Sequence, residues 1–232
     1  MEASLRDLWR VVDDLSRIRA PSSRFYRVTI FGSARMQPGE RLYNEVRDLA
    51  SQLAALGCDI VTGGGPGLMQ AANEGEQVGD PDNRTRSFGL PIELPHEEAA
   101  NPFVERVYKH RTFFTRLHHF VRLSDAFIVV RGGIGTSLEA LMVWQLCQVR
   151  HVYDKPFILV GEMWKDLVQW ARNHMIHPGR NLADPQDLSI PFCAATIEEA
   201  VARIRDHKAQ VDGAGKRKSR SRRPSRRPQS GG

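Results

Sequence analysis

The chain has 232 residues, of which 41% are hydrophobic and 26% charged, which suits one sizeable buried core and excludes a disordered polyelectrolyte. Its net charge of +6 comes from residues 213–232, which hold eight basic and no acidic residues and leave 25 basic against 27 acidic residues elsewhere. No run of about 18 apolar residues indicates a membrane span, and acidic residues among the first twenty argue against a targeting segment. Three cysteines without C-x-x-C spacing fit the reducing cytoplasm, with neither disulfides nor a thiolate zinc site.

The first predicted element is an amphipathic helix within residues 1–22 that packs on the body of the protein. Before a break at Pro21-Ser22-Ser23, apolar residues recur at helical spacing: Leu5, Leu8, Trp9, Val12, Leu15 and Ile18.

Strands and helices then alternate along residues 23–210, which we expect to form a single domain. The expected strands cover residues 28–31, 58–61, 87–94, 125–130 and 157–160, with a last short strand near Ile190. The expected helices cover residues 42–56, 68 onward, 101–124 after a Pro-containing loop, 137–149, 164–175 and 197–208. Near-continuous apolar strands are typical of a parallel sheet covered on both faces, so we predict a doubly wound, Rossmann-like α/β fold.

The helix expected at 137–149 is apolar around its whole circumference, which requires burial on several sides. One side can meet the sheet and another a second subunit, so we predict a homodimer. Residues 211–232 are rich in Lys, Arg, Ser, Pro and Gly and are predicted to form a disordered basic tail. Such a tail can bind nucleic acid nonspecifically or simply be a solvated extension, and composition does not choose between these roles.

Two glycine-rich loops are predicted at the carboxyl ends of strands, where ligands bind in open α/β sheets. The first is Gly63-Gly64-Gly65-Pro66-Gly67 and the second is Arg131-Gly132-Gly133-Ile134-Gly135-Thr136. Glycines let backbone amides approach an anion, and a following helix N-terminus favours negative charge, so each loop suits a phosphate. The alternative for the first loop is a tight turn with Pro66 at the first helical position. Neither loop has the dinucleotide or P-loop pattern, and a nucleoside monophosphate has the size to lie between them.

Two charged residues beside these loops are candidates for chemistry. Glu139 follows Thr136 with the spacing of a capping box, so it is equally suited to satisfying a backbone amide and to catalysis. Arg116 lies among aromatic residues and can bind a phosphate bidentately or pair with an acidic side chain. Adjacent His118 and His119 point to different faces of a helix, which argues against a metal site there.

Several short segments between Val28 and Trp170 form a recognisable set: Phe31-Gly32-Ser33, the 63–69 loop with Ala71-Ala72-Asn73, Ile92-Glu93-Leu94-Pro95, Asn101-Pro102, Phe113-Phe114-x-Arg116, Ser124-Asp125-Ala126-Phe127 and the second glycine loop. Together they resemble the LOG (lonely guy) family of cytokinin riboside 5′-monophosphate phosphoribohydrolases and nucleotide nucleosidases, formerly described as possible lysine decarboxylases. Two departures are Arg131 in place of the family's proline and Leu117 in place of a lysine.

The resemblance implies an enzyme that hydrolyses the N-glycosidic bond of AMP or a cytokinin riboside monophosphate, without a metal or cofactor. It implies Glu139 and Arg116 as catalytic residues. The expected substrate-binding residues are Gly32, Ser33, Gly64, Gly65, Gly67, Arg131, Gly132, Gly133, Gly135 and Thr136. No lysine suited to pyridoxal phosphate is indicated, so decarboxylation is not expected. The two departures leave a non-catalytic carrier of a nucleotide or phosphorylated cofactor as the alternative.

Overall fold

The computed structural model describes residues 25–93, 100–177 and 179–221. Its strands are β1 (Tyr26–Phe31), β2 (Cys58–Thr62), β3 (Ser87–Gly89), β4 (Arg106–Val107), β5 (Ala126–Val129), β6 (Phe157–Val160) and β7 (Phe192–Ala194). Its helices are α2 (Arg41–Ala55), α3 (Leu68–Gly79), α4 (Phe113–Leu123), α5 (Ile134–Gln148), α6 (Glu162–Met175) and α7 (Ile197–Ser221), with a short 3₁₀ turn, η1 (Asp187–Ser189). The helix predicted within residues 1–22 lies outside the described residues.

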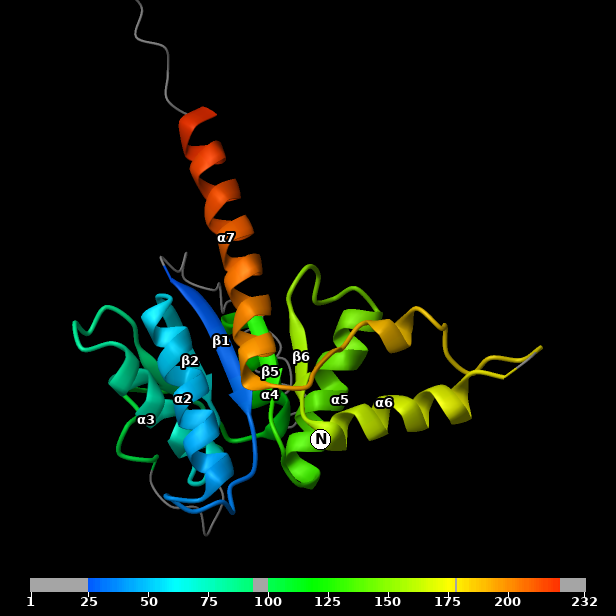
Figure 1. Cartoon of the computed structure of the whole chain (residues 1–232), viewed down its shortest axis with the longest axis horizontal. Helices are drawn as coiled ribbons and strands as arrows, with labels where there is room; N and C mark the ends of the chain where they lie inside the picture. Colours follow the sequence, from blue (N-terminus) through cyan, green and yellow to red (C-terminus); the bar gives the residue numbers. More distant parts are fainter. Residues whose placement is uncertain (1–24, 94–99, 178, 222–232) are drawn as a thin grey trace, which may run out of the picture.

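All seven strands pair in parallel in the order β4-β3-β2-β1-β5-β6-β7. Figure 1 labels four strands from the middle of this order, β2, β1, β5 and β6. The chain builds one half of the sheet outward from β1 and then returns to add β5 on the other side of β1. The strand order therefore reverses between β1 and β5, which is where ligands bind in doubly wound sheets. The predicted Rossmann-like fold is confirmed.

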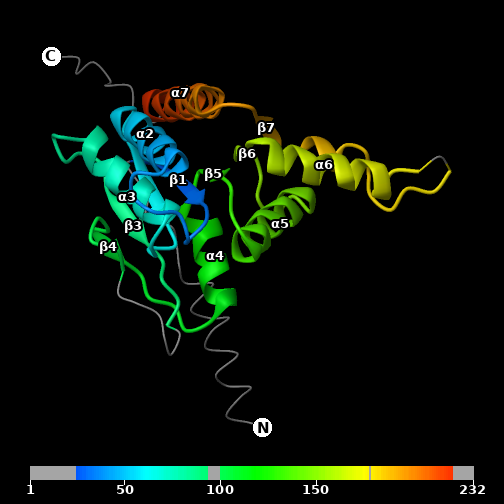
Figure 2. The ribbon, with the colours of Figure 1, turned by 60° about the horizontal axis from the view of Figure 1, so that its bottom comes forward.

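Helices cover both faces of the sheet, as the parallel arrangement requires (Figure 2). Alternate strand residues point to opposite faces, so Val28 and Ile30 pack with α2, α3 and α7, whereas Phe31, Phe127 and Val129 pack with α4, α5 and α6. Each face thus has its own buried apolar cluster. These two packed layers support the loops at the carboxyl edge of the sheet.

Most element boundaries agree with the predictions, and α2 gives a local reason. The helix ends before Gly57, which has a φ of +79°, a left-handed conformation that glycine adopts without a Cβ clash. The prediction of helix from residue 101 is wrong, because residues 106–107 pair with β3 as β4 and α4 begins only at Phe113. The strand expected near Ile190 is formed by 192–194 instead.

The C-terminal helix is longer than predicted. Residues 211–221, the first half of the predicted disordered tail, continue α7 to Ser221, and residues 222–232 of that prediction lie outside the described residues. After Ile197 the chain meets its first proline only at Pro224, and good helix formers such as Ala, Lys, Gln and Arg outweigh the cost of Gly213 and Gly215. Among the described residues, no helix is both long and apolar enough to cross a membrane.

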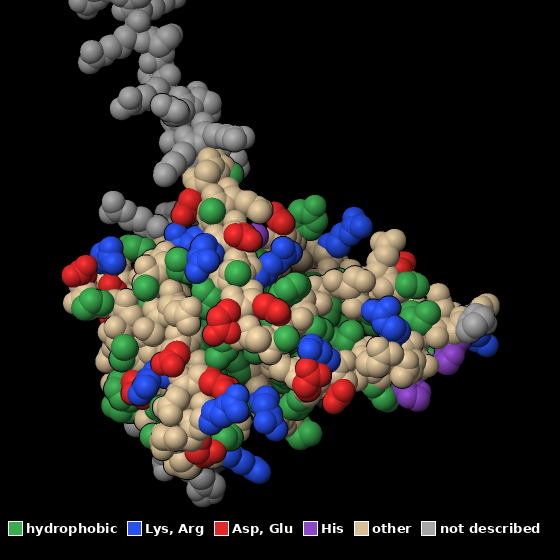
Figure 3. Space-filling model, viewed as in Figure 1, with side chains coloured by type: hydrophobic (Ala, Val, Ile, Leu, Met, Phe, Trp, Pro, Cys, Tyr) green, Lys and Arg blue, Asp and Glu red, His purple; other side chains and the backbone are tan. Residues whose placement is uncertain are grey.

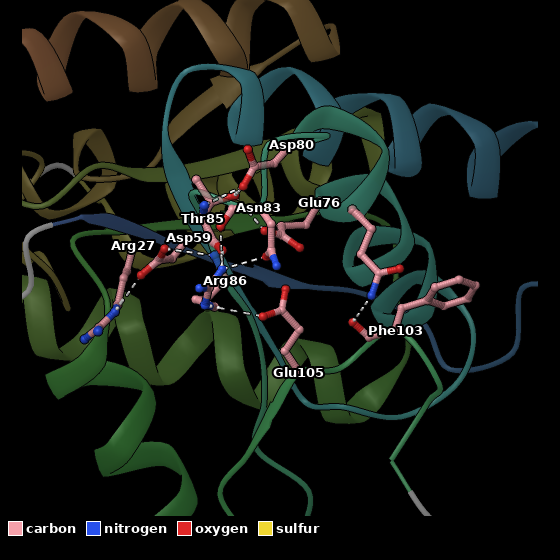
Figure 4. Close-up of polar contacts among 10 residues, drawn as sticks. Arg27, Asp59, Glu76, Asp80, Asn83, Thr85, Arg86, Phe103 and Glu105 are labelled. Carbon is pink, nitrogen blue, oxygen red and sulfur yellow. Dashed lines mark hydrogen bonds and ion pairs between the residues drawn. The ribbon is translucent and has the colours of Figure 1, made fainter.

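A buried polar cluster joins the end of α3 to β2 and β3 (Figure 4). The Thr85 Oγ1 lies 2.6 Å from Glu76 Oε1 and 2.8 Å from Asp80 Oδ2. Nearby, the Nε of Arg27 donates to Asp59 Oδ2 at 3.2 Å. These contacts fix α3, whose other end begins at the first glycine loop.

Candidate active site at the carboxyl edge of the sheet

The loops that follow β1, β2 and β5 meet at the carboxyl edge of the sheet. The backbone N–H of Ser33, after β1, donates to the carbonyl of Arg131, after β5, at 3.1 Å. The Ser33 carbonyl in turn accepts from the N–H of Leu68, the first residue of α3, at 2.8 Å. The structure thus brings together all three loops in which sequence analysis placed substrate-binding residues.

Glycines in the loops after β1 and β2 allow this close approach. Gly67 has a φ of +71°, and a Cβ there would collide with the backbone of Ser33 and Ala34. A Cβ on Gly32 would lie 2.9 Å from the Cβ of Leu68. Gly67 is the N-cap residue of α3, so the alternative that placed Pro66 at the first helical position is wrong.

Two buried asparagines hold the first glycine loop in place. Asn101 donates from its backbone N–H to the carbonyl of Gly64 at 2.8 Å and from its side chain to the carbonyl of Gly65 at 2.9 Å. Its side chain also reaches Asn73 Oδ1 at 3.0 Å, which accepts from the hydroxyl of Thr62 at 2.7 Å. Sequence analysis gave neither asparagine a role, because segments far apart in the chain bring them together.

The second glycine loop leads directly into α5. Gly133 is the N-cap residue and Ile134 the first residue of the helix, so Thr136 already lies inside its first turn and is buried. The capping-box alternative for Thr136 and Glu139 is therefore wrong. A Cβ on Gly133 or on Gly135 would meet nothing within 4 Å, so space is open beside the start of α5.

Arg116 and Glu139 form a nearly buried ion pair between the two loops. The Nη1 of Arg116 lies 3.4 Å from Glu139 Oε1, and the two side chains are 12% and 13% exposed. The Nε of Arg116 donates to the carbonyl of Leu90 at 2.6 Å, and its guanidinium lies 5.4 Å from the centre of the Phe120 ring. A fixed guanidinium and a carboxylate thus face the same place above the sheet.

The environment of Glu139 keeps its carboxyl half protonated near neutral pH. Burial raises the pKa of Glu139 to about 7, against the smaller opposing effect of the Arg116 charge. A carboxyl with such a pKa can take up or release a proton at physiological pH, as general acid–base catalysis requires. Perturbed carboxyl groups of this kind are concentrated in active sites.

Arg116 also contacts the first glycine loop. A Cβ on Gly63 would collide with the Nη2 of Arg116 and would lie 2.7 Å from the Sδ of Met69. Sequence analysis did not identify Met69 or the Leu90 carbonyl as neighbours of Arg116, because only the fold places them beside α4. Arg116 therefore lies against the first glycine loop and pairs with Glu139 in the helix that follows the second.

Arg131 differs from the other predicted site residues. It is exposed and lines a groove with residues on the α2 and α7 face of the sheet, among them Arg41 and Gly161. Arg116 and Glu139 lie on the α4 and α5 face. The backbone carbonyl of Arg131 joins the loops after β1 and β5, while the groove that Arg131 lines lies on the opposite face of the sheet from the ion pair.

Two histidines lie behind Arg116. The Nε2 of His110 is 3.0 Å from Nδ1 of the buried His119, and burial lowers the pKa of His119 to about 4. Within the described ranges, no three His, Cys, Asp or Glu side chains come together in a way that could bind a metal ion. Burial also lowers the pKa of His110, so both rings are neutral at physiological pH.

The fold and the site define an α/β protein with a nearly buried carboxyl of raised pKa beside the switch point of its sheet. Comparisons with known proteins give its family. Residues 69–204 match the model of the family described as possible lysine decarboxylase. The chain therefore belongs to this family, the LOG family.

Two relatives and one solved structure illustrate the likeness. The pyrimidine/purine nucleotide 5′-monophosphate nucleosidase of Escherichia coli K12 is 32% identical over 140 residues, or 58% of this chain, which spans only 30% of that relative. A probable cytokinin riboside 5′-monophosphate phosphoribohydrolase of Oryza sativa subsp. japonica is 30% identical over 197 residues, covering 80% of this chain and 74% of the relative. The molybdenum cofactor carrier protein of Chlamydomonas reinhardtii shares the fold, with a TM-score of 0.61 and 18% identity over 80% of this chain and 99% of that one.

Proposed function

We propose that the protein hydrolyses the N-glycosidic bond of nucleoside 5′-monophosphates of the AMP or cytokinin riboside type, releasing the free base and ribose 5-phosphate. The observation that carries this proposal is the ion pair of Glu139 and Arg116, nearly buried between two glycine loops. The names of the two relatives support the same reaction. The reaction needs water and the nucleotide as its only reactants.

Glu139 is the residue that we assign to the bond-breaking step. As the bond between C1′ and the base nitrogen breaks, its electrons move to the base and positive charge develops on the ribose, as in other glycoside hydrolyses. The carboxylate of Glu139 balances this charge and accepts a proton from the attacking water, whose oxygen bonds to C1′. That proton then passes to the departing base, so that atoms and charges balance.

The nucleotide phosphate has a suitable position at the start of α5. Gly133 and Gly135 leave open space there, and the helix N-terminus presents backbone amides and a favourable dipole to an anion. Arg116 supplies a guanidinium beside this space, which neutralises the phosphate and orients the ribose toward Glu139. The first loop and Ser33 form the other wall of the site.

Measuring the release of free base tests this proposal. Purified protein is incubated with AMP, GMP, CMP, UMP or isopentenyl-adenosine monophosphate, and the bases are separated by chromatography. We expect release by the wild type and a loss of about 10²- to 10⁴-fold in Glu139→Gln, with nucleotide affinity largely retained. Tight nucleotide binding without release by the wild type would contradict hydrolysis and favour the carrier alternative.

We also propose that the protein is a homodimer joined through α5. Three apolar side chains spaced along this helix are exposed: Ile134 at 89%, Leu138 at 47% and Leu141 at 50%. Water contact with such a row is unfavourable, and contiguous exposed apolar surface marks interaction sites. A second copy of the same helix offers a complementary apolar surface.

A further inference from the structure

A second cavity lies at the amino edge of the sheet, where β6 and β7 begin. Its volume is about 480 Å³, within the range of pockets that bind small molecules. Its walls come from the end of α5, the loop between α5 and β6, η1 and the middle of α7. That loop reaches α7, where Nε2 of His207 lies 2.9 Å from the carbonyl of Asp154 (Figure 1). The other ring nitrogen of His207 lies 2.6 Å from the hydroxyl of Tyr26, the first residue of β1, so α7 is held against the sheet here.

The cavity is separate from the candidate active site. α5 begins beside the second glycine loop and carries Glu139 in its second turn, whereas Cys147 and Gln148 at its other end line the cavity. A rise of about 1.5 Å per residue places Cys147 roughly 12 Å further along the helix than Glu139. A ligand in the cavity and a nucleotide beside Glu139 therefore occupy different places.

The wall of the cavity contains two residues with a backbone conformation that suits glycine. Arg150, the first residue after the C-cap of α5, has a φ of +57°, and Asp154 has a φ of +53°. The N–H groups of Arg150 and His151 donate to the carbonyls of Cys147 and Leu146, which is the Schellman motif that glycine usually completes. An arginine at this position bears a steric cost that glycine avoids. Because residues held in such conformations cluster at functional sites, this wall is a candidate binding site.

The charged side chains of the cavity differ in whether their polar atoms are already used. Nζ of Lys155 donates to two backbone carbonyls at the end of α4. Asp184 accepts from a backbone N–H at 2.9 Å, and Asp187 accepts from a backbone N–H at 3.2 Å and from a glutamine side chain at 3.3 Å. Within the described residues, the guanidinium groups of Arg150 and Arg203 make no hydrogen bond or ion pair.

Unused positive charge therefore exceeds unused negative charge in the cavity. Among the described acidic residues that line it, Asp154 alone has a carboxylate without a hydrogen bond or ion pair. Figure 3 shows acidic and basic side chains interspersed over one face of the body, so that face has no broad basic surface. A guanidinium binds phosphate or carboxylate bidentately, so Arg150 and Arg203 together favour a ligand that carries one of these groups.

Aromatic and apolar side chains complete the lining of the cavity. The guanidinium of Arg203 lies 5.6 Å from the centre of the Phe192 ring, and Phe192 is 41% exposed. Tyr153 also lines the cavity and is 76% exposed, while Val152 and Phe157 are buried in its wall. Aromatic faces and flat guanidinium groups stack on planar rings, so this lining suits an aromatic ligand.

We infer that this cavity binds a small planar anion, an aromatic ring that carries a phosphate or a carboxylate. Arg150 and Arg203 bind the anionic group, and Phe192 and Tyr153 contact the ring. The ligand is distinct from the nucleotide beside Glu139, since the two sites lie at opposite ends of α5. The inference therefore does not depend on the proposed hydrolysis.

Calorimetric titration of the full-length protein with 1-naphthyl phosphate and with 1-naphthoate tests the inference. We expect the tighter of these two probes, which identifies the anionic group, to bind at least about tenfold more tightly than inorganic phosphate or 1-naphthol. Inorganic phosphate lacks the ring, and 1-naphthol lacks the charge. Arg203→Gln should weaken binding of the tighter probe at least about tenfold, because a charge-assisted hydrogen bond is lost. The matched control is Arg205→Gln, an exposed position of the same helix outside the cavity, which should keep the wild-type affinity.

Two further variants separate ligand binding from folding and from the nucleotide site. Arg150→Gly should also weaken binding about tenfold, while its thermal unfolding midpoint should not fall, because glycine adopts the left-handed conformation without a clash. Arg116→Gln should bind the probe as tightly as the wild type does. The inference is overturned if neither probe binds, if inorganic phosphate binds equally well, or if Arg203→Gln and Arg205→Gln have the same affinity. A loss of affinity in Arg116→Gln alone would place the probe at the nucleotide site and overturn it as well.

Discussion

Glu139 and Arg116 are coupled through their charges, and this coupling determines the pH at which the carboxylate is available. Burial raises the pKa of Glu139 to about 7, and the nearby guanidinium holds it below the value that burial alone would produce. Removing one member of a nearly buried ion pair leaves the other uncompensated, which is costly. Substitution of Arg116 therefore alters the ionisation of Glu139 as well as the binding of phosphate.

The proposed reaction should accelerate as pH rises through about 7, because the carboxylate is the active form and the protonated carboxyl is not. In Arg116→Gln the cation that lowers the pKa of Glu139 is gone, so the rise in the residual rate should move to higher pH. The pH dependence of kcat/KM measures both. Lys109→Gln, an exposed change near α4, is the control and should keep the pH profile of the wild type. A rise at the same pH in all three proteins would contradict the role of Glu139.

At the scale of the element, the glycines of the two loops differ in what surrounds them. Gly63 lies against Arg116 and Met69, while Gly133 and Gly135 face open space. Glycine thus serves two purposes at this site. In the first loop and at Gly132 it permits contact within the protein, and at Gly133 and Gly135 it leaves the start of α5 open.

Gly63→Ala should reduce activity at least tenfold, because its Cβ would push Arg116 away from Glu139 and a small misplacement of catalytic groups is costly. The matched control is Gly213→Ala in α7, where a Cβ meets nothing within 4 Å. That change should leave activity unchanged and favour the helix by about 1 kcal/mol. Base-release assays and thermal unfolding of both variants make the comparison, and full activity in Gly63→Ala would show that Arg116 does not depend on this glycine.

The end of α3 contains a second carboxyl with an altered pKa. The hydroxyl of Thr85 lies within hydrogen-bond distance of both Glu76 and Asp80 but has one proton to donate, so one carboxyl must supply the other proton. Burial, together with nearby acidic residues, raises the pKa of Glu76 to about 7, which identifies it as the protonated member. Ionisation of Glu76 therefore opposes the contact that joins α3 to β3.

Glu76→Gln should stabilise the protein at pH 8 and have little effect at pH 4.5. The unfolded chain releases this proton near pH 4.5 and the folded protein holds it to about pH 7, so stability falls as pH rises through that interval. The gain at pH 8 is at most about 3 kcal/mol, from 1.36 kcal/mol per pKa unit. Urea unfolding at the two pH values measures it, with Asp166→Asn, a change at an exposed carboxylate, as control. A loss of stability at pH 8 would show that Glu76 is ionised in the fold.

At the scale of the whole molecule, the sheet separates two surfaces. Its carboxyl edge bears the loops and the ion pair, whereas α7 contacts its amino edge through His207. A third surface, the exposed side of α5, begins next to the second glycine loop. In the proposed dimer, a second subunit on α5 lies next to the second glycine loop.

Leu141→Glu should convert the proposed dimer into a monomer. A charge at the centre of an apolar interface loses its hydration without gaining a partner, which costs several kcal/mol in association. Light scattering after size-exclusion chromatography measures the mass. Val78→Glu changes an exposed apolar residue on α3 and is the control, which should keep the mass of the wild type. A wild-type protein of monomeric mass would rule out the dimer.

The α/β class, the parallel sheet and the two glycine loops followed from the sequence by itself, because buried strands, amphipathic helices and loop glycines leave local patterns. The family resemblance of the motif segments singled out Arg116 and Glu139, and the family comparison confirmed the membership. Short elements such as β4 escaped detection, since two residues carry no periodicity and are defined by their pairing with β3.

Only the tertiary structure decided what the residues of the site do to one another. The spacing of Thr136 and Glu139 suited a capping box equally well, until the start of α5 at Ile134 and the contact with Arg116 excluded it. The raised pKa of Glu139, the roles of Asn73 and Asn101 and the direction of α7 likewise depend on segments that are distant in the chain. Burial and charge act through space, so no local pattern of residues records them.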